Sequence, residues 1–302
     1  MNEEELDAKV ELLVRKSQTG SKLARNELSK VLAPLFDEPT SDDLEKEINA
    51  TVDYIIHKLV VENYCETNAE GIFHDEYLSY FARSIHAQNS KGGRFYVCGD
   101  THFFHKIHNG RYALGRLDGM HHGVAAGLTV LTATRYLDDF LKRGIYDPKE
   151  IAKRISEKMY LIPKKGGSAF TTLFVSILDD STAHISCVGD GQTLLFQSAT
   201  GTLTAIKSEG PVIGIAGPQI LKTIEYKTEE FELKKGDVLV SYTDGVNERK
   251  GFEFQKIEEF VKYHNADIKT TVQNILDYAE GLLPQGGGLA DDTTAIGLRI
   301  LK

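Results

Sequence analysis

The chain has 302 residues, 41% of them hydrophobic and 26% charged, so it can bury a sizeable core, and wholesale disorder or a collagen-like fibre is excluded. No apolar run approaches the roughly 18 residues that span a bilayer, and the acidic start of the chain is unlike a basic signal peptide. The three cysteines lie far apart and fit neither a disulfide framework nor a CxxC zinc site. These features predict a reduced, cytoplasmic protein that does not enter a membrane.

The negative charge is concentrated in the first third of the chain. Residues 1–90 carry 18 acidic and 9 basic side chains, whereas residues 91–302 carry 26 of each. This asymmetry favours two modules. The lack of a basic excess argues against nucleic-acid binding, which needs a basic face.

The first module is expected to be helical. Apolar side chains follow helical spacing within residues 6–14, 28–35 and 44–60. Thr40 or Ser41 can cap the third helix, whose first turn carries acidic residues that suit the positive end of the helix dipole. Residues 66–92 are polar and end near glycines, so we expect a linker there.

The apolar spacing changes after Gly93. We expect strands at 94–98 and 111–117, on either side of His108-Asn109-Gly110, which is typical of a hairpin loop. Helices are expected at 123–142 and from Pro148 onward. Further strands are expected at 170–178, 183–188, 193–197, 221–226, 231–233, 237–243 and 293–300, with helices at 253–264 and 269–282. Consecutive strands and clustered helices favour an α+β sandwich over a doubly wound parallel sheet.

At four places an aspartate stands beside glycine or a second aspartate at the end or middle of a strand: Gly99-Asp100, Asp118-Gly119, Asp244-Gly245 and Asp291-Asp292. A three-residue hairpin loop puts Asp100 directly opposite Asp118, whereas a two-residue loop puts it opposite Gly119. Either register brings like charges together, and they repel unless a cation lies between them. Four carboxylates at strand ends suit an all-oxygen site for Mg²⁺ or Mn²⁺.

In chain order these motifs resemble those of the metal-dependent protein phosphatases of the 2C type. Within that family they are most similar to the bacterial SpoIIE/RsbU/RsbX-like branch. The resemblance extends to the segments 170–174, 210–215 and 235–239. It implies a protein phosphatase 2C-like β-sandwich flanked by helices over residues 92–302. The preceding residues 1–91 would then form an N-terminal all-α regulatory module and linker.

The resemblance also implies roles for individual residues. Asp118 would bridge two Mn²⁺ or Mg²⁺ ions and the Gly119 carbonyl would be a further ligand. Asp244 and Asp291 would complete the first metal, and Asp100 would serve the second. Asp118 and Asp244 would be the catalytic carboxylates of a one-step hydrolysis by water activated between the two ions. Of the pair Asp291-Asp292, the first aligns with the family's ligand.

Some residues depart from the family pattern. Phe103 stands where many members carry a second acid, Leu117 precedes Asp118, and Met120 takes the place of a histidine found in eukaryotic relatives. The departures at Phe103 and Leu117 keep a pseudophosphatase, a binding module without turnover, as the alternative, and the one at Met120 leaves the proton donor to the leaving group unassigned. Each Asp-Gly pair taken alone could also be an ordinary turn.

A nearby group of histidines invites a zinc interpretation. Strand alternation, however, points His105 away from His102 and His108, which makes a single zinc site awkward.

We therefore expect a cytoplasmic phosphoserine/phosphothreonine protein phosphatase. By family analogy its phosphoprotein substrate is a phosphorylated anti-sigma-factor antagonist in stress or developmental signalling. The N-terminal module is expected to bind an activating protein or to form a homodimer, with the switch at residues 66–92. A hydrolase of small phosphorylated metabolites and a purely structural protein are further alternatives.

Overall fold

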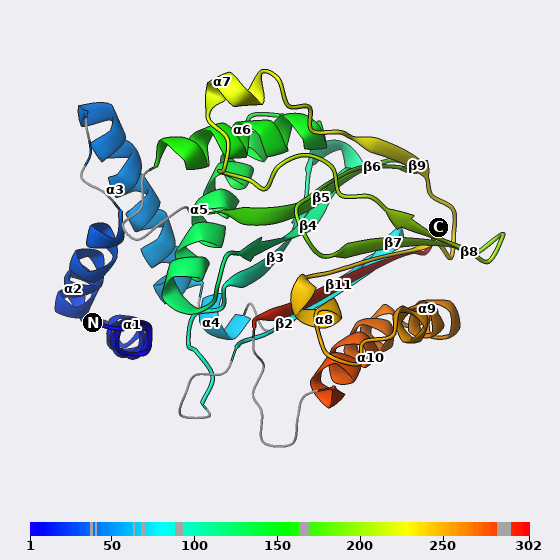
Figure 1. Ribbon diagram of the computed structural model, residues 1–302, viewed down its shortest axis with the longest axis horizontal. Helices are drawn as coiled ribbons and strands as arrows, with labels where there is room; N and C mark the ends of the chain where they lie inside the picture. Colours follow the sequence, from blue (N-terminus) through cyan, green and yellow to red (C-terminus); the bar gives the residue numbers. More distant parts are fainter. Residues whose placement is uncertain are drawn as a thin grey trace.

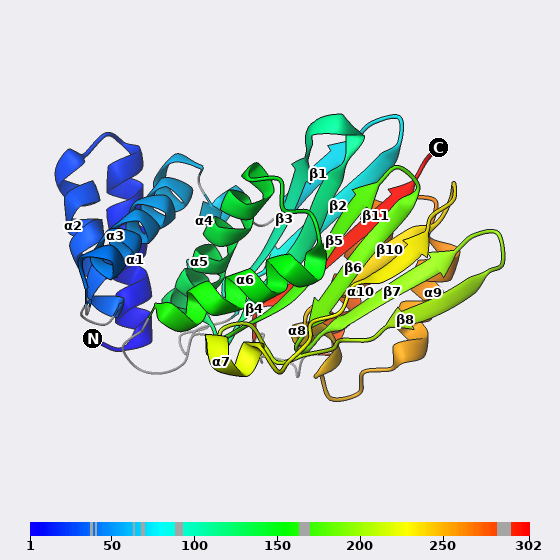
Figure 2. The ribbon, with the colours of Figure 1, turned by 90° about the horizontal axis from the view of Figure 1, so that it is seen from above.

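Two antiparallel sheets pack face to face, and helices cover the outer face of each sheet (Figure 1, Figure 2). The computed structural model describes residues 1–36, 39, 41–62, 64–67, 70–87, 93–162, 170–282 and 291–302. The layers run helices, sheet, sheet, helices. This arrangement confirms the predicted α+β sandwich.

The larger sheet has six strands in the order β1 (Glu70–His74), β2 (Leu78–Ile85), β11 (Thr293–Ile300), β10 (Val238–Tyr242), β7 (Gln192–Gln197) and β8 (Thr202–Ile206). The five-stranded sheet has the order β3 (Asp100–Lys106), β4 (Tyr112–Gly119), β5 (Thr171–Asp179), β6 (Thr182–Val188) and β9 (Glu229–Glu232). Every neighbouring pair is antiparallel. The last strand of the chain, β11, therefore lies between strands from the first and the second half.

Four longer helices cover the sandwich. The five-stranded sheet is covered by α5 (Gly123–Lys142) and α6 (Pro148–Leu161), and the six-stranded sheet by α9 (Phe254–Tyr263) and α10 (Ile268–Gly281). Two short helices, α7 (Pro218–Leu221) and α8 (Asp244–Asn247), lie in the connections between strands. Asp147 caps α6 and Pro148 occupies its first turn, as expected.

The N-terminal residues form α1 (Glu3–Gln18), α2 (Lys22–Leu32), α3 (Asp42–Ile56) and the short α4 (Tyr64–Thr67). Asn2 and Glu5 form a capping box at the start of α1. The Ser41 hydroxyl accepts a hydrogen bond from the Leu44 N–H at 3.3 Å and so caps α3. Thr40, the other candidate cap, lies outside the described residues.

Apolar side chains form three clusters. One lies between the two sheets, and a second lies between the six-stranded sheet and α8–α10. The third is continuous from α1, α2 and α3 through α5 and α6 to the outer face of the five-stranded sheet. The N-terminal helices are therefore packed on the sandwich, beside α5 (Figure 2). The expected module boundary, between residues 91 and 92, lies outside the described residues.

Three expectations for local structure are wrong. The expected linker at 66–92 contains β1 and β2, because β2 pairs with β11 over its whole length. Residues 94–98 belong to none of the strands given above, since the Asp7 carboxylate of α1 accepts hydrogen bonds from the N–H groups of Tyr96 and Val97. The expected strand at 221–226 is the end of α7 and an irregular connection. Among the described residues, no helix combines the length and the apolar character needed to cross a membrane.

Candidate functional site

The hairpin of β3 and β4 brings two candidate carboxylates together. Asp100 pairs directly with Asp118, which selects the three-residue loop of the two registers that the sequence allowed. Asn109 and Gly110 in that loop have φ of 66° and 76°, a conformation that asparagine and glycine tolerate best. The loop chemistry thus fixes which side chains face each other at the far end of the hairpin.

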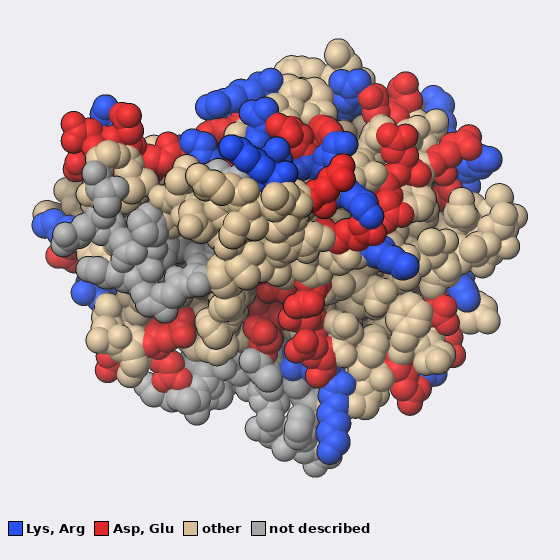
Figure 3. All heavy atoms as spheres, turned by 45° about the horizontal axis from the view of Figure 1, so that its top comes forward, with Lys and Arg blue, Asp and Glu red and all other residues tan. Residues whose placement is uncertain are grey.

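A cavity of about 220 Å³ lies where β4, β5, α8 and β11 begin or end. Its lining includes four aspartates together with backbone and apolar atoms: Asp118, Gly119, Met120, His121, Phe170, Thr171, Thr172, Asp190, Val212, Asp244 and Asp291. The face drawn in Figure 3 has a hollow near its middle in which acidic side chains gather. Four of the five predicted metal-ligand residues therefore line one cavity.

The fifth residue, Asp100, lies behind this lining. Its side chain is 1% exposed, and the Thr243 hydroxyl donates to its carboxylate at 2.9 Å. The Tyr64 hydroxyl donates to the Asp100 carbonyl at 3.0 Å. Because Thr243 directly precedes Asp244, this hydrogen bond links the Asp100 carboxylate to the start of α8.

The cavity carboxylates lack the partners that buried charges normally have. Asp118 Oδ2 and Asp244 Oδ1 are buried without a hydrogen-bond partner. Burial, then repulsion from Asp100 and Asp244, raises the pKa of Asp118 well above its ordinary range. Burial raises the pKa of Asp291 to about 6. Unsatisfied, mutually repelling oxygens are the condition that a divalent cation relieves, so the donor set fits Mg²⁺ or Mn²⁺.

The carboxylates surround the cavity without forming a ready-made cage. In the part of the chain that the structure describes, no three His, Cys, Asp or Glu side chains converge closely enough to hold an ion as they stand. Like charges without a cation between them keep apart, so side-chain rotation would be needed to complete a ligand set.

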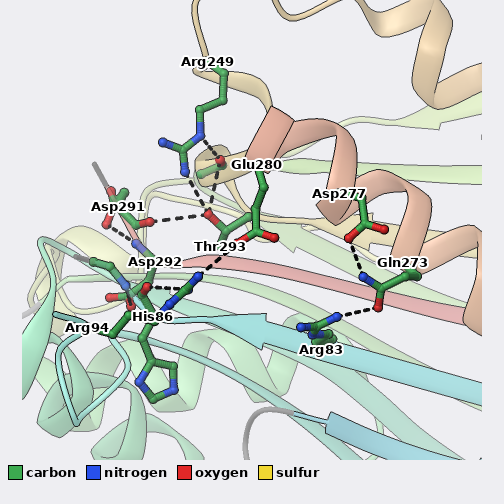
Figure 4. A network of polar contacts seen from close by, with 12 residues as sticks. Arg83, His86, Arg94, Arg249, Gln273, Asp277, Glu280, Asp291, Asp292 and Thr293 are labelled. Atoms are coloured by element: carbon green, nitrogen blue, oxygen red, sulfur yellow. Dashed lines mark hydrogen bonds and ion pairs between the residues drawn. The ribbon is translucent and has the colours of Figure 1, made fainter. Parts of the chain in front are cut away.

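The adjacent pair Asp291 and Asp292 is divided between two tasks. Asp292 is 1% exposed and its carboxylate accepts from the N–H groups of Ala87 and Gly99, both at 2.8 Å. Asp291 lines the cavity, and its carboxylate accepts a hydrogen bond from the N–H of Asp292 at 2.8 Å. Figure 4 shows Asp291 on the side of Arg249 and Asp292 toward His86.

Two glycines are required by close packing at the site. A Cβ atom on Gly119 would lie 2.7 Å from the Ala126 carbonyl oxygen, and one on Gly245 would lie 2.1 Å from the Asp292 carbonyl oxygen. Any side chain at these positions would push the strand ends apart. The glycine in each Asp-Gly motif therefore lets the neighbouring aspartate approach the others.

Sequence reasoning missed two arginines beside the cavity. The Arg249 side chain donates to the Gly245 carbonyl at 2.8 Å and to the Thr293 hydroxyl at 3.0 Å (Figure 4). Arg116 is 3% exposed and donates to Thr172, which lines the cavity. The signal for Arg116 was its place in an otherwise apolar strand, two residues before Asp118 and so on the same face.

His102 and His105 lie on opposite faces of β3. His105 lies 3.1 Å from the Asp138 carboxylate on α5, whereas His102 lies 3.4 Å from the Tyr80 hydroxyl, on the other side of β3. Strand alternation separates them, as the sequence predicts. His121 lines the carboxylate cavity, with φ of 70°.

Helix α1 contacts both segments that carry the site. The Asp7 carboxylate, 5% exposed, accepts from the Tyr96 N–H at 2.7 Å and the Val97 N–H at 3.0 Å, shortly before Asp100. Glu3 lies 4.0 Å from His122, shortly after Asp118. Helix α1 thus contacts the segment that precedes Asp100 and the segment that follows Asp118.

The family model described as Stage II sporulation protein E (SpoIIE) matches residues 108–301. Stage II sporulation protein E of Priestia megaterium is 24% identical over 279 residues, which cover 90% of this chain and 43% of that protein. Phosphoserine phosphatase RsbU of Bacillus subtilis is 26% identical over 184 residues, covering 59% of this chain and 52% of RsbU. The chain spans about half the length of the curated relatives it matches.

Two solved structures show the same fold. The PP2C phosphatase domain of SpoIIE from Bacillus subtilis, solved with a fragment of its regulatory domain, has a TM-score of 0.59 and 22% identity, covering 75% of this chain and 65% of that one. RsbX in complex with magnesium has a TM-score of 0.54 and 16% identity, covering 76% and 99%. The fold is thus the PP2C type, and the family model spans more than half of the chain. The chain belongs to the SpoIIE family.

Proposed function

We propose that this chain is a metal-dependent phosphatase that hydrolyses phosphoserine or phosphothreonine in proteins. One observation carries the proposal: Asp118 and Asp244 present buried, unpartnered oxygens to a cavity that Asp291 also lines. The names of two relatives support it, since RsbU is a phosphoserine phosphatase and RsbX was crystallised with magnesium.

The same residues would hold the metal. Asp118, the Gly119 carbonyl, Asp244 and Asp291 would ligate Mn²⁺ or Mg²⁺, and Asp100 would serve a second ion from behind the cavity. When bound, two such ions would lower the pKa of water and neutralise phosphoryl oxygens.

The protein's own contribution is to prepare the carboxylates. The Thr243 hydroxyl holds Asp100, and the Asp292 N–H holds Asp291. The buried oxygens of Asp118 and Asp244 interact more strongly with nearby charges than they would in water. Met120, 43% exposed at the cavity, offers an apolar contact to a protein substrate next to its phosphorylated residue.

We propose that the N-terminal helices regulate this site. Asp7 fixes the segment before Asp100, and Glu3 approaches the segment after Asp118. An activating protein or a second copy that displaced α1 would release both segments at once. Within this proposal the helices α1–α4 are the regulatory module, whereas β1 and β2, which also lie within residues 1–91, belong to the sandwich. By family analogy the substrate is a phosphorylated anti-sigma-factor antagonist in the cytoplasm.

The test of activity is hydrolysis of p-nitrophenyl phosphate and of a phosphoserine peptide in the presence of Mn²⁺. We expect the wild-type chain to be active. The control Asp180→Asn should be active too, because Asp180 follows β5 at the end opposite Thr171 and Thr172, which line the cavity. Asp118→Asn should be inactive. Equal rates for wild type and Asp118→Asn would favour the pseudophosphatase. Faster hydrolysis of free phosphorylated metabolites than of the peptide would favour a metabolite hydrolase.

A further inference from the structure

Arg116 is a buried cation directly behind the acidic cavity. It lies on β4, is 3% exposed, and points to the same face of the strand as Asp118. Its side chain crosses from one sheet to the other, because its Nε donates to the Ser241 hydroxyl of β10 at 2.9 Å. A guanidinium inside a β-sandwich is costly unless a negative charge compensates it.

The direct partners of this guanidinium are all neutral. Besides Ser241, it donates to the Thr172 hydroxyl at 3.4 Å and to the Asp190 carbonyl at 3.3 Å. No carboxylate of the described residues forms an ion pair with it. Burial lowers the pKa of Arg116, and the nearby aspartates oppose this effect, Asp118 most strongly, followed by Asp100 and Asp244.

The turn after β6 is shaped around this side chain. Gly191 has φ of 89°, and a Cβ atom there would lie 2.0 Å from Arg116 Nη2. The same turn supplies the Asp190 carbonyl that accepts from Nη2. The guanidinium is therefore held in one place, where it can act on the carboxylates without blocking the cavity that they line.

We infer that Arg116 is a permanent internal counter-charge for the acidic cavity: a positioning residue that offsets carboxylate repulsion in the metal-free protein and weakens the attraction of the cavity for divalent cations. The cation-binding part of this inference rests on the proposed function. The charge-compensating part does not, because it concerns the metal-free fold.

Two substitutions separate charge from shape. Arg116→Gln removes the charge and keeps an amide that can donate to Ser241 or Thr172. Arg116→Lys keeps the charge but loses the planar fork and most of its hydrogen bonds. A purely structural arginine would make both variants similarly defective. If Arg116 is a counter-charge, Arg116→Lys should resemble the wild type in the double-mutant cycle and in its affinity for Mn²⁺, even where both variants lose stability.

The first experiment is a double-mutant cycle in EDTA, with the unfolding temperature as readout. Asp118→Asn should change the unfolding temperature little in the wild-type or Arg116→Lys background. In the Arg116→Gln background it should raise that temperature by several degrees, because repulsion there is uncompensated. Equal effects of Asp118→Asn in all three backgrounds would overturn the inference.

The second experiment is calorimetric titration of the full chain with Mn²⁺. We expect Arg116→Gln to bind Mn²⁺ about tenfold more tightly than the wild type, and Arg116→Lys to bind it with wild-type affinity. Equal affinity of all three would contradict the predicted effect on cation binding. If the wild type takes up no Mn²⁺, the proposed function fails, and the EDTA cycle still decides the role of Arg116.

Arg116→Gln by itself could be too unstable to fold. In that case the double variant Arg116→Gln/Asp118→Asn decides the question. Recovery of folded protein in the double variant supports the counter-charge, because a second substitution at a purely structural site would not restore the fold. A double variant as unfolded as Arg116→Gln overturns it.

Discussion

Two groups of aspartates with buried oxygens in this molecule differ in how completely those oxygens are bonded. Asp7, Asp237 and Asp292 each accept two or more hydrogen bonds, with backbone N–H groups among the donors. Asp118 and Asp244 each leave one buried oxygen without a partner. Burial of an oxygen therefore does not separate the two groups, whereas the satisfaction of its hydrogen bonds does.

The two groups are expected to respond differently to the same chemical change. Replacing a carboxylate by an amide at a fully bonded aspartate turns one acceptor into a donor facing other donors, which costs stability. The same change in the cavity removes repulsion between carboxylates, so it costs metal binding and activity instead. Substitution of aspartate by asparagine thus tests the comparison at each site.

The largest expected effect is on activity at Asp118. We predict that Asp118→Asn lowers Mn²⁺-dependent hydrolysis by about a thousandfold, since removing a ligand forfeits several kcal/mol of transition-state stabilisation. Its unfolding temperature in EDTA should stay close to that of the wild type. Steady-state kinetics and a thermal melt measure the two effects, and a large loss of stability would place Asp118 in the structural group.

Asp292→Asn should show the reverse pattern. We expect a loss of about 2–4 kcal/mol in the free energy of unfolding, because two backbone N–H groups and the Cys98 thiol would lose a charged acceptor. Urea denaturation measures the loss, with Asp291→Asn as the adjacent control that should be spared. Equal destabilisation of the two variants would contradict the division between these neighbours.

Asp7→Asn tests whether a fully bonded aspartate can also influence the cavity. We predict a loss of about 1–2 kcal/mol in stability and a higher Mn²⁺ concentration for half-maximal activity, because the segment before Asp100 loosens. Glu11→Gln on the same helix, whose carboxylate forms an ion pair with Arg15 at the surface, is the matched control. An unchanged Mn²⁺ requirement would limit Asp7 to a role in stability.

The smallest effect concerns pH. The pKa of Asp291 is raised to about 6, above the ordinary value of roughly 3.9 that it takes when unfolded. The native protein then binds more protons than the unfolded chain between these values, so this group's contribution to stability is lost as the pH rises toward 6. In EDTA, Asp291→Asn should gain stability relative to the wild type between pH 4 and pH 6. A stability difference between the two proteins that stays constant across that range would contradict the raised pKa of Asp291.

Much of the architecture could be predicted from local patterns. The helices of the first sixty residues follow from apolar spacing and capping residues, and the pairing of Asp100 with Asp118 follows from a three-residue loop. Strand β2 forms a local hairpin with β1, but it was missed because its other partner, β11, lies more than two hundred residues away in the chain. Residues 94–98 were expected to form a strand because nothing nearby reveals that Asp7 supplies their hydrogen-bond acceptor.

The sequence by itself determined which residue types could gather at the strand ends, because alternation, loop length and Asp-Gly spacing act over a few residues. Only the tertiary structure decided which aspartate of an adjacent pair faces the cavity and which is fully bonded to backbone. The tertiary structure alone placed Arg116 behind the cavity carboxylates. It alone also placed α1 against the segment that precedes Asp100. These outcomes depend on contacts between distant segments, whose energies no local pattern contains.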